Sequence, residues 1–408
     1  MGGWTGRGTG VGWPPARVWR LGVAVWLLAS VFTVVDTLRS DDLNLSWTQA
    51  EAFIAGRLDV PEADHDVAVV GGKVYVPFPP LPALLLVPFA ALGAHRDVVL
   101  LVAVACAALC FRLARGIFAA LGCTPDQVRW LTAALLAGTG FWLVVLWSRG
   151  VWYFAAVVGV TCLLAAIHEA LTAGRAWAVG LFAGLAVLSR QMAVYSLLFV
   201  LPVLWSHPRR TGRSGRVLAV AGALAVFGAL AAAYPLFNWL RFGTPWETGY
   251  AFIRHAGHLA PRVAEHGLFS PAYVPANLVH MFLQGPHVVF SGPDLLRIDG
   301  PDPFGTSLTF ASPFLFLAVL ARGRRPVILG AATGAAACLG HQLLYHTQGW
   351  VQWNAQRYAL DFIPLLMVLV ALAVPRIDPR VWKPLIGYAI ALNFLMLFVV
   401  PNLHRLAR

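Results

Sequence analysis

The feature that most constrains this chain is a series of long apolar blocks that runs from Val18 to the C-terminus. The blocks are about 18 residues or longer, and an α-helix of that length crosses the roughly 30 Å hydrocarbon core of a membrane. Hydrophobic residues make up 59% of the chain and charged residues 12%, whereas soluble domains have roughly 45–50% and about 25%. The sequence therefore excludes a water-soluble globule and predicts an all-α, polytopic integral membrane protein.

We place about eleven transmembrane helices in these blocks, with the N-terminus in the cytoplasm. Residues 1–16 form a predicted disordered cytoplasmic tail. The first block lacks a clear small-x-small cleavage site, so we interpret it as a span rather than a signal peptide. The predicted spans are residues 18–36, 97–111, 130–147, 151–171, 176–189, 191–206, 217–238, 308–321, 326–346, 358–374 and 382–400.

The distribution of charge supports this register. Seventeen Lys and Arg residues fall on the predicted cytoplasmic side with three acids, whereas the other side carries thirteen basic and fifteen acidic residues. An excess of Lys and Arg in cytoplasmic loops is the positive-inside pattern of membrane proteins. The net charge of +12 is thus explained by topology, and no basic face with interleaved aromatic residues indicates nucleic-acid binding.

Two loops on the predicted extracytoplasmic side are long, residues 37–96 and 239–307. The first contains Pro79–Gly93, an apolar block that is short and broken by proline. We predict that this block is a helix in the outer membrane interface or a re-entrant segment, because counting it as a span would move Arg112 and Arg115 to the outside. Long loops on one side indicate chemistry at that surface.

Eight acids lie in or directly before the first outer loop, counting Asp36, and two of them are candidates for catalysis. Asp41 and Asp42 follow the first span by a few residues and precede an amphipathic stretch. A carboxylate at the membrane face is suited to act as a general base toward an acceptor hydroxyl, or to hold a divalent metal such as Mg²⁺ or Mn²⁺. The later acids, from Asp59 to Asp66, are interpreted as a solvated acidic segment.

Isolated arginines near predicted outer helix ends form a second candidate group. Each is flanked by apolar or aromatic residues, and arginine binds phosphate in bidentate geometry. The group predicts a pocket for an anionic lipid headgroup; the alternatives are snorkelling to headgroups or pairing with an outer carboxylate such as Asp361. The four residues are Arg149, Arg190, Arg241 and Arg357.

Other patterns are interpreted as structural. His255 and His258 have i, i+3 spacing, but without an identifiable third ligand they are interpreted as surface histidines rather than a metal site. The five cysteines fall in or beside apolar blocks, so no disulfide is expected. Gly180 and Gly184 form a small-xxx-small pattern within a span, which predicts close helix packing.

Four stretches of the chain carry a resemblance to a known family. They are GGKVYVPFPPLPALLLVPFAALG in the first outer loop, Tyr234–Tyr250, Phe304–Ala318 and Gln352–Leu366. Together they resemble the bacterial, polyprenyl-phosphate-sugar-dependent glycosyltransferases of the GT-C fold, which are related to protein mannosyltransferases and aminoarabinose transferases. The resemblance implies that residues 1–408 form a single membrane-embedded GT-C-like domain, with an interfacial helix in its first outer loop.

The activity that the resemblance implies is sugar transfer from a polyprenyl-phosphate carrier to an acceptor hydroxyl, with inversion. It implies that the acceptor is a glycan, lipid or protein, and that the reaction occurs on the extracytoplasmic side of the bacterial inner membrane. By position, Asp41 or Asp42 matches the acidic motif of the family's first loop and would act as the base, and Arg149 matches the second-loop arginine. The four arginines would stabilise charge on the leaving phosphate, and Lys73 and Tyr75 are placed to contact the sugar or phosphate.

Two other functions stay open. A flippase or transporter of a lipid-linked sugar would be expected to have shorter outer loops and more charged residues at mid-membrane. An inactive GT-C-like subunit of an envelope-assembly complex is the other alternative, because residues Gly150–Ala166 contain no carboxylate, whereas the family usually has one after its second-loop arginine.

Overall fold

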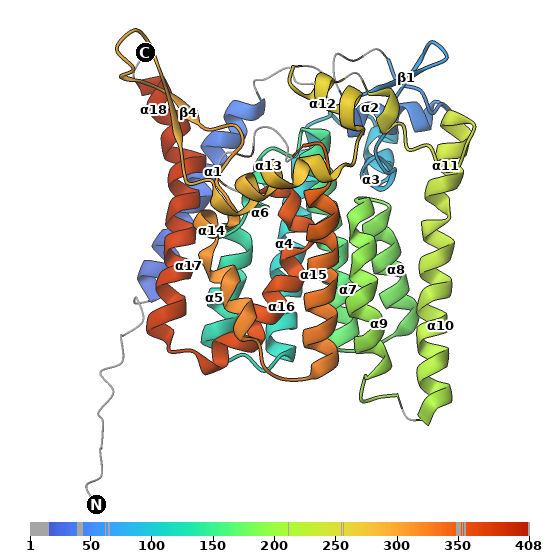
Figure 1. Ribbon diagram of the computed structural model, residues 1–408, viewed down its shortest axis with the longest axis vertical. Coiled ribbons are helices and arrows are strands. Elements are labelled where there is room, and N and C mark those ends of the chain that lie inside the picture. Colours follow the sequence, from blue (N-terminus) through green and yellow to red (C-terminus); the bar gives the residue numbers. More distant parts are fainter. Residues whose placement is uncertain are drawn as a thin grey trace, which may run out of the picture.

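The structure is a computed structural model that describes residues 16–38, 44–61, 63, 66–210, 212–253, 255, 257–347, 352, 354 and 356–406. Most of the described chain forms a bundle of roughly parallel and antiparallel helices, with a layer of short elements across one end (Figure 1). The bundle elements are α1 (Ala16–Leu38), α4 (Val98–Ala120), α5 (Pro125–Ala137), α6 (Phe141–Leu146), α7 (Val151–Leu171), α8 (Ala176–Val187), η1 (Gln191–Ser196), α9 (Leu197–Trp205), α10 (Gly212–Ala231), α11 (Ala233–Phe242), α14 (Leu308–Ala311), η5 (Pro313–Leu320), α15 (Arg325–Leu343), η6 (Arg357–Asp361), α16 (Ile363–Ala373), η7 (Val374–Arg376), α17 (Pro379–Phe394), η8 (Leu395–Val399) and α18 (Val400–Leu406).

The layer at one end is built from the two long loops, and we call this end the loop end (Figure 1). Two antiparallel hairpins lie in it, β1 with β2 and β3 with β4. The elements of the layer are α2 (Leu45–Ile54), β1 (Ala68–Val70), β2 (Lys73–Tyr75), α3 (Leu81–Ala91), η2 (Tyr250–Phe252), α12 (Leu259–His266), η3 (Pro271–Tyr273), α13 (Val274–Leu278), η4 (Val279–Leu283), β3 (Val288–Ser291) and β4 (Arg297–Pro301).

Turns rich in arginine meet at the opposite end, which we call the arginine-rich end. Arg324 donates to the carbonyl of Ser206 at 3.3 Å, and Arg376 donates to the carbonyl of Arg322 at 3.1 Å. The loops predicted to be cytoplasmic therefore gather at one end of the bundle, as the charge pattern predicts. Their assignment to the cytoplasm stays a prediction.

Four helical segments of the described chain are long and apolar enough to cross a membrane by themselves. They are Val98–Ala120, Val151–Leu171, Gly212–Phe242 and Pro379–Leu403. The second has the bounds predicted from the sequence and is the central helix of the bundle, with 83% of its apolar window buried. The fold is thus that of a polytopic helical membrane protein, while the number of eleven spans stays a prediction.

Several predicted spans consist of two shorter elements placed end to end. The predicted span 130–147 is broken at Gly138–Gly140 into α5 and α6, and the span 308–321 is broken at Ser312 into α14 and η5. The two breaks meet, because the Ser312 hydroxyl donates to the carbonyl of Gly138 at 2.6 Å. A carbonyl freed by a helix break must find such a partner when no water is near.

The predicted boundary at residue 111 is wrong, since α4 continues to Ala120. Arg112 and Arg115 therefore lie within the last turns of this helix rather than in a loop. Both side chains are exposed, and a long arginine side chain extends toward water from the end of a span without ending the helix.

Two packing predictions are confirmed. Pro79–Gly93 contains a helix, α3, whose first residue donates its backbone N–H to the carbonyl of Leu188 at 3.0 Å. Leu84 of this helix and Leu92, the residue that follows it, are exposed at 47% and 87%, so an apolar face is open to lipid. The glycines of the small-xxx-small pattern lie against α10, where a Cβ on Gly180 would come within 2.2 Å of the carbonyl oxygen of Ala223.

Candidate functional site

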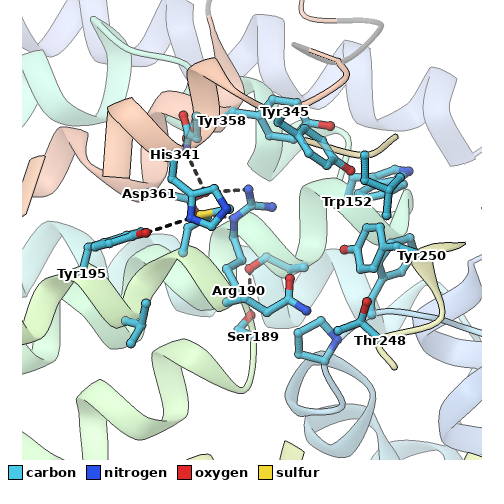
Figure 2. Close-up of a pocket in the computed structure, with 18 of the residues that line it drawn as sticks. Trp152, Ser189, Arg190, Tyr195, Thr248, Tyr250, His341, Tyr345, Tyr358 and Asp361 are labelled. Carbon is cyan, nitrogen blue, oxygen red and sulfur yellow. Dashed lines mark hydrogen bonds and ion pairs between the residues drawn. The ribbon is translucent and has the colours of Figure 1, made fainter. Parts of the chain in front are cut away.

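A cavity of about 440 Å³ lies at the loop end, which we call the Arg190 cavity (Figure 2). Its walls come from the start of α7, the turn between α8 and η1, the end of α15 and the short helix η6. Residues of the second long loop, among them Thr248, Tyr250 and Phe269, complete the lining. Segments far apart in the sequence thus converge on one cavity beneath the loop layer.

Arg190 forms an ion pair with Asp361 at the centre of the cavity (Figure 2). The guanidinium Nε bonds one carboxylate oxygen, and Nη2 bonds the other at 2.7 Å. The two side chains are only 14% and 3% exposed, and such a buried charge is stable when it is paired in this bidentate geometry. For Arg190 the structure thus shows the alternative given above, pairing with an outer carboxylate, and its role in binding a phosphate stays a prediction.

The surroundings fix this ion pair in place. The amide of Gln342 donates to Asp361 at 3.2 Å and to the carbonyl of Tyr358 at 2.9 Å. Gly159 of α7 lies beneath the arginine, where a Cβ would come within 3.2 Å of the Arg190 side chain. Nη1 of Arg190 has no hydrogen-bond partner among the described residues, so one donor edge stays available on the cavity side.

Aromatic side chains form a large part of the cavity wall. Trp152, Tyr250, Tyr345 and Tyr358 lie on one side of Arg190 in Figure 2. Burial raises the pKa of the Tyr250 phenol well above its usual value, so the hydroxyl stays protonated and able to donate a hydrogen bond. Aromatic rings with polar tips combine an apolar face with a hydrogen-bonding group, which suits a ligand that carries both.

Two hydrogen-bonded pairs also line the cavity. The Tyr195 hydroxyl lies 2.8 Å from Nδ1 of His341 (Figure 2), and the amide of Gln191 donates to the Tyr234 hydroxyl at 2.5 Å. Sequence reasoning did not identify these residues, because single tyrosines within apolar blocks are indistinguishable from packing residues in the sequence.

Asp66 is a carboxylate at the margin of the cavity that the sequence analysis assigned to a solvated segment. Its Oδ2 accepts a hydrogen bond of 2.7 Å from Nε1 of Trp152, and Trp152 lines the cavity. The backbone of Asp66 has φ of 61°, a left-handed conformation that is uncommon for residues other than glycine. The neighbouring bridge between Ala68 and Ile253 brings the first and second outer loops together here.

The other predicted arginines do not line the Arg190 cavity. Arg149 is 3% exposed, and its Nε lies 3.3 Å from Oδ1 of Asp97. Arg357 lies behind the cavity wall, where Nη1 donates to the hydroxyl of Tyr153 at 2.9 Å. Arg190 and Arg357 both lie near the ring of Tyr358, with guanidinium carbons 5.7 and 5.4 Å from its centroid.

Arg241 has a structural environment that joins the two outer loops. Its guanidinium lies 3.8 Å from the ring centroid of Phe237 and 4.6 Å from that of Phe242. It donates to the backbone carbonyl of Val76 and, at 2.8 Å, to the Asn238 side chain. The four arginines therefore do not form one cluster, and Arg190 is the member that faces the cavity.

The remaining predicted site residues lie elsewhere or outside the described chain. Lys73 is exposed on the β1–β2 hairpin. Tyr75 is buried, with its ring centroid 5.5 Å from that of Phe242, and neither residue lines the Arg190 cavity. Asp41 and Asp42 lie outside the described residues, so their assignment as catalytic acids stays a prediction.

The two histidines of the second loop face different partners. His255 lies 5.0 Å from His346 between ring centroids, whereas His258 lies 5.9 Å from the Phe304 ring. Burial lowers the pKa of His255. Among the described residues no three His, Cys, Asp or Glu side chains gather as a metal site; a divalent metal held by Asp41 or Asp42 stays a prediction.

Comparison with known proteins bears on the fold. No protein-family model matches the chain, and no curated protein matches it. The crystal structure of ArnT from Cupriavidus metallidurans bound to undecaprenyl phosphate is similar, with a TM-score of 0.52 and 19% sequence identity over 92% of this chain and 64% of that chain. The structure of the same protein in the apo state has a TM-score of 0.49 and 19% identity, over 92% of this chain and 63% of that chain.

This likeness confirms the predicted class of fold, a polytopic GT-C-like helical fold similar to that of ArnT. At 19% identity it establishes the fold and no particular activity. The chain spans about 64% of the length of the ArnT structure that it matches.

Proposed function

We propose that this protein is a membrane glycosyltransferase that moves a sugar from a polyprenyl-phosphate carrier to an acceptor hydroxyl, with inversion at the anomeric carbon. The acceptor is a glycan, lipid or protein, and the reaction takes place on the extracytoplasmic side of the bacterial inner membrane. The observation that carries the proposal is the Arg190 cavity, which sets a fixed cation among aromatic walls. It lies at the end of the bundle opposite the arginine-rich turns.

Arg190 is suited to stabilise the leaving phosphate. Its Nε and Nη2 are held by Asp361, so the guanidinium cannot reorient when charge develops nearby. A phosphate oxygen that accepts from Nη1 would therefore meet a preorganised donor. A bond between a cationic donor and an anionic oxygen is also roughly twice as strong as a neutral hydrogen bond.

The aromatic wall is suited to the sugar. Trp152 and Tyr250 offer ring faces for the apolar side of a pyranose or furanose, and protonated phenols offer hydrogen bonds to its hydroxyls. The cavity volume of about 440 Å³ lies within the range of about 300–1,000 Å³ that is typical of small-ligand sites. The polyprenyl chain would leave the cavity between helices.

The acceptor hydroxyl needs a general base, and we assign this role to Asp41 or Asp42. These residues immediately precede α2 in the sequence, and α2 packs on α3 at the loop end. The carboxylate would take the hydroxyl proton as the oxygen attacks the anomeric carbon, while the bond from that carbon to the phosphate oxygen breaks. Polyprenyl phosphate leaves with the electron pair.

The experiment is release of polyprenyl phosphate from a labelled panel of polyprenyl-phosphate sugars by purified protein in detergent. Wild type is compared with Asp41→Asn, Asp42→Asn and Arg190→Gln, and with the matched variant Arg297→Gln, which removes an exposed arginine from β4. We expect Arg190→Gln to reduce turnover by about 10²–10³-fold, one carboxylate variant to abolish turnover while carrier binding persists, and Arg297→Gln to match wild type.

Other outcomes would favour the alternative functions. Wild type that moves labelled carrier across a vesicle bilayer without breaking the sugar–phosphate bond would establish a flippase. Wild type that binds carrier but turns over none of the donors with any acceptor would favour the inactive subunit.

A further inference from the structure

A second cavity, of about 710 Å³, lies between α1, α4, α5 and α6 toward the arginine-rich end. We call it the Trp19 cavity. It shares no lining residue with the Arg190 cavity. Arg115 and Arg129 line one part of it, and the rest of its lining is aliphatic or aromatic apart from Thr132.

Tryptophans give this cavity fixed walls. The rings of Trp26 and Trp142 pack edge to face at 6.3 Å between centroids, and Nε1 of Trp142 donates to the hydroxyl of Ser30 at 2.8 Å. Trp26 also packs against Phe398 of η8 at 5.3 Å. The walls are thus held by contacts outside the cavity, so the cavity is formed before any ligand enters.

The cavity is open along its side. The wall residues Val23, Leu27 and Phe111 are 52%, 50% and 46% exposed, and they belong to helices that we predict to be in the membrane. In a membrane, lipid acyl chains surround such an apolar helix surface. An acyl chain therefore has direct lateral access to the cavity.

The arginine-lined and apolar parts of the cavity are separated along the helix axis, as the headgroup and acyl chains of a phospholipid are. Arg129 lies in the first turns of α5 and Ala137 at its end, which separates them by about 12 Å along the axis. Half of a hydrocarbon core is about 15 Å. Trp19, at the same end as the arginines, packs on Trp130 at 5.1 Å, and tryptophan is enriched at the level of the lipid headgroups.

The charge of the polar part is positive. Arg115 and Arg129 are exposed, whereas the nearby carboxylate of Asp126 lies 3.2 Å from Nζ of Lys383. A headgroup with a net negative charge is therefore attracted to this part of the cavity, and arginine is suited to bind its phosphate.

We propose that the Trp19 cavity binds one anionic phospholipid from the leaflet at the arginine-rich end. The phosphate contacts Arg115 and Arg129, and an acyl chain lies along Trp26 and Trp142. The proposal does not depend on the function proposed for the Arg190 cavity.

The test is native mass spectrometry of protein released from nanodiscs that contain equal amounts of phosphatidylglycerol and phosphatidylcholine. We expect wild type to retain phosphatidylglycerol in preference. The preference should fall by about fivefold for each arginine removed in Arg115→Gln and Arg129→Gln. Arg112→Gln is the matched control, because it removes an exposed arginine one turn away on α4 that does not line the cavity.

A second pair of variants tests the apolar part. Ala133→Trp fills the wall and keeps both arginines, so retention of both lipids should fall, whereas Ala120→Trp, at the exposed end of α4, should not change it. Thermal unfolding of each variant shows that it is folded. Equal retention of the two lipids by wild type, equal loss in Arg112→Gln and Arg115→Gln, or full retention in Ala133→Trp would each overturn the proposal. So would full displacement of the lipid by soluble glycerol phosphate.

Discussion

The Arg190 cavity and the Trp19 cavity combine the same residue types in opposite ways. In the first, the arginine side chain is 14% exposed and fixed on Asp361. In the second, Arg115 and Arg129 are exposed, and the fixed elements are the tryptophans of the wall. One cavity thus holds its charge rigidly, and the other holds only its apolar walls rigidly.

The difference teaches how arginine is used at the two ends of a membrane bundle. A buried guanidinium needs a partner, because removing an ion from water costs several kcal/mol. The partner also fixes its position, as catalysis by preorganised charge requires. An exposed guanidinium keeps much of its hydration, which is sufficient for attraction to a headgroup that arrives by lateral diffusion.

The largest expected effect comes from removing the partner of the buried arginine. Asp361→Ala leaves the Arg190 charge uncompensated and should lower the free energy of unfolding by about 3–5 kcal/mol. Thermal and denaturant unfolding in detergent measure this loss. The double variant Arg190→Gln with Asp361→Asn should recover most of the stability and none of the proposed turnover.

The matched control for this prediction is Asp299→Asn, which breaks an exposed pair with Arg297 that is 3.7 Å long. Its effect should be about 0–1 kcal/mol. A loss in Asp361→Ala as small as that in Asp299→Asn would show that the buried pair does not hold its charge rigidly.

An intermediate effect is expected at the margin of the Arg190 cavity. Trp152→Phe keeps an aromatic ring but removes the hydrogen bond to Asp66. If this bond positions the cavity wall for the proposed donor, KM should rise about tenfold, while kcat stays within about a factor of two. This rise corresponds to the lower end of the roughly 1.5–3 kcal/mol that a hydrogen bond to a charged group contributes. Steady-state kinetics over a range of donor concentrations separate the two constants.

Asp66→Asn sharpens this measurement, since it keeps an acceptor oxygen and removes the charge. We expect it to resemble Trp152→Phe in KM. A loss of kcat in Asp66→Asn, with Asp41→Asn and Asp42→Asn active, would move the role of general base to Asp66.

The smallest expected effect is that of salt. Exposed charges are screened within about 10 Å at 0.1 M salt and about 3 Å at 1 M, so retention of phosphatidylglycerol at the Trp19 cavity should fall several-fold over this range. Binding of a polyprenyl phosphate at the buried Arg190 should change by less. Parallel titrations of both ligands with sodium chloride make the comparison, and equal salt dependence would contradict it.

Much of the fold could be predicted from the sequence, because spans and charge asymmetry are local properties of the chain. The bounds of α7, the helix within Pro79–Gly93 and the gathering of arginine-rich turns were all accessible in this way. The break at Gly138–Gly140 was not, because the same residues within an apolar block are also compatible with a continuous helix.

The candidate site could be predicted only in part. Arg190 was recognisable as an arginine out of place in an apolar region, but its partner lies 171 residues further along the chain. Helix packing decides which arginine reaches Asp361, and it brings Tyr195 and Tyr250 to the same cavity. No local sequence pattern encodes this packing. The acid at position 66 was misassigned because its contact with Trp152 joins two distant segments.

The contact between Ser312 and Gly138 has a consequence for the order in which the membrane part is assembled. The two broken segments meet across 174 residues of sequence, so the first cannot complete its hydrogen bonding until the second has left the ribosome. Until then the carbonyl of Gly138 needs a temporary partner, such as water or another polar group near the insertion machinery. The later segment, α14 with η5, therefore completes the hydrogen bonding of the earlier segment, α5 with α6. Truncation before residue 308 would leave the carbonyl of Gly138 without the Ser312 hydroxyl.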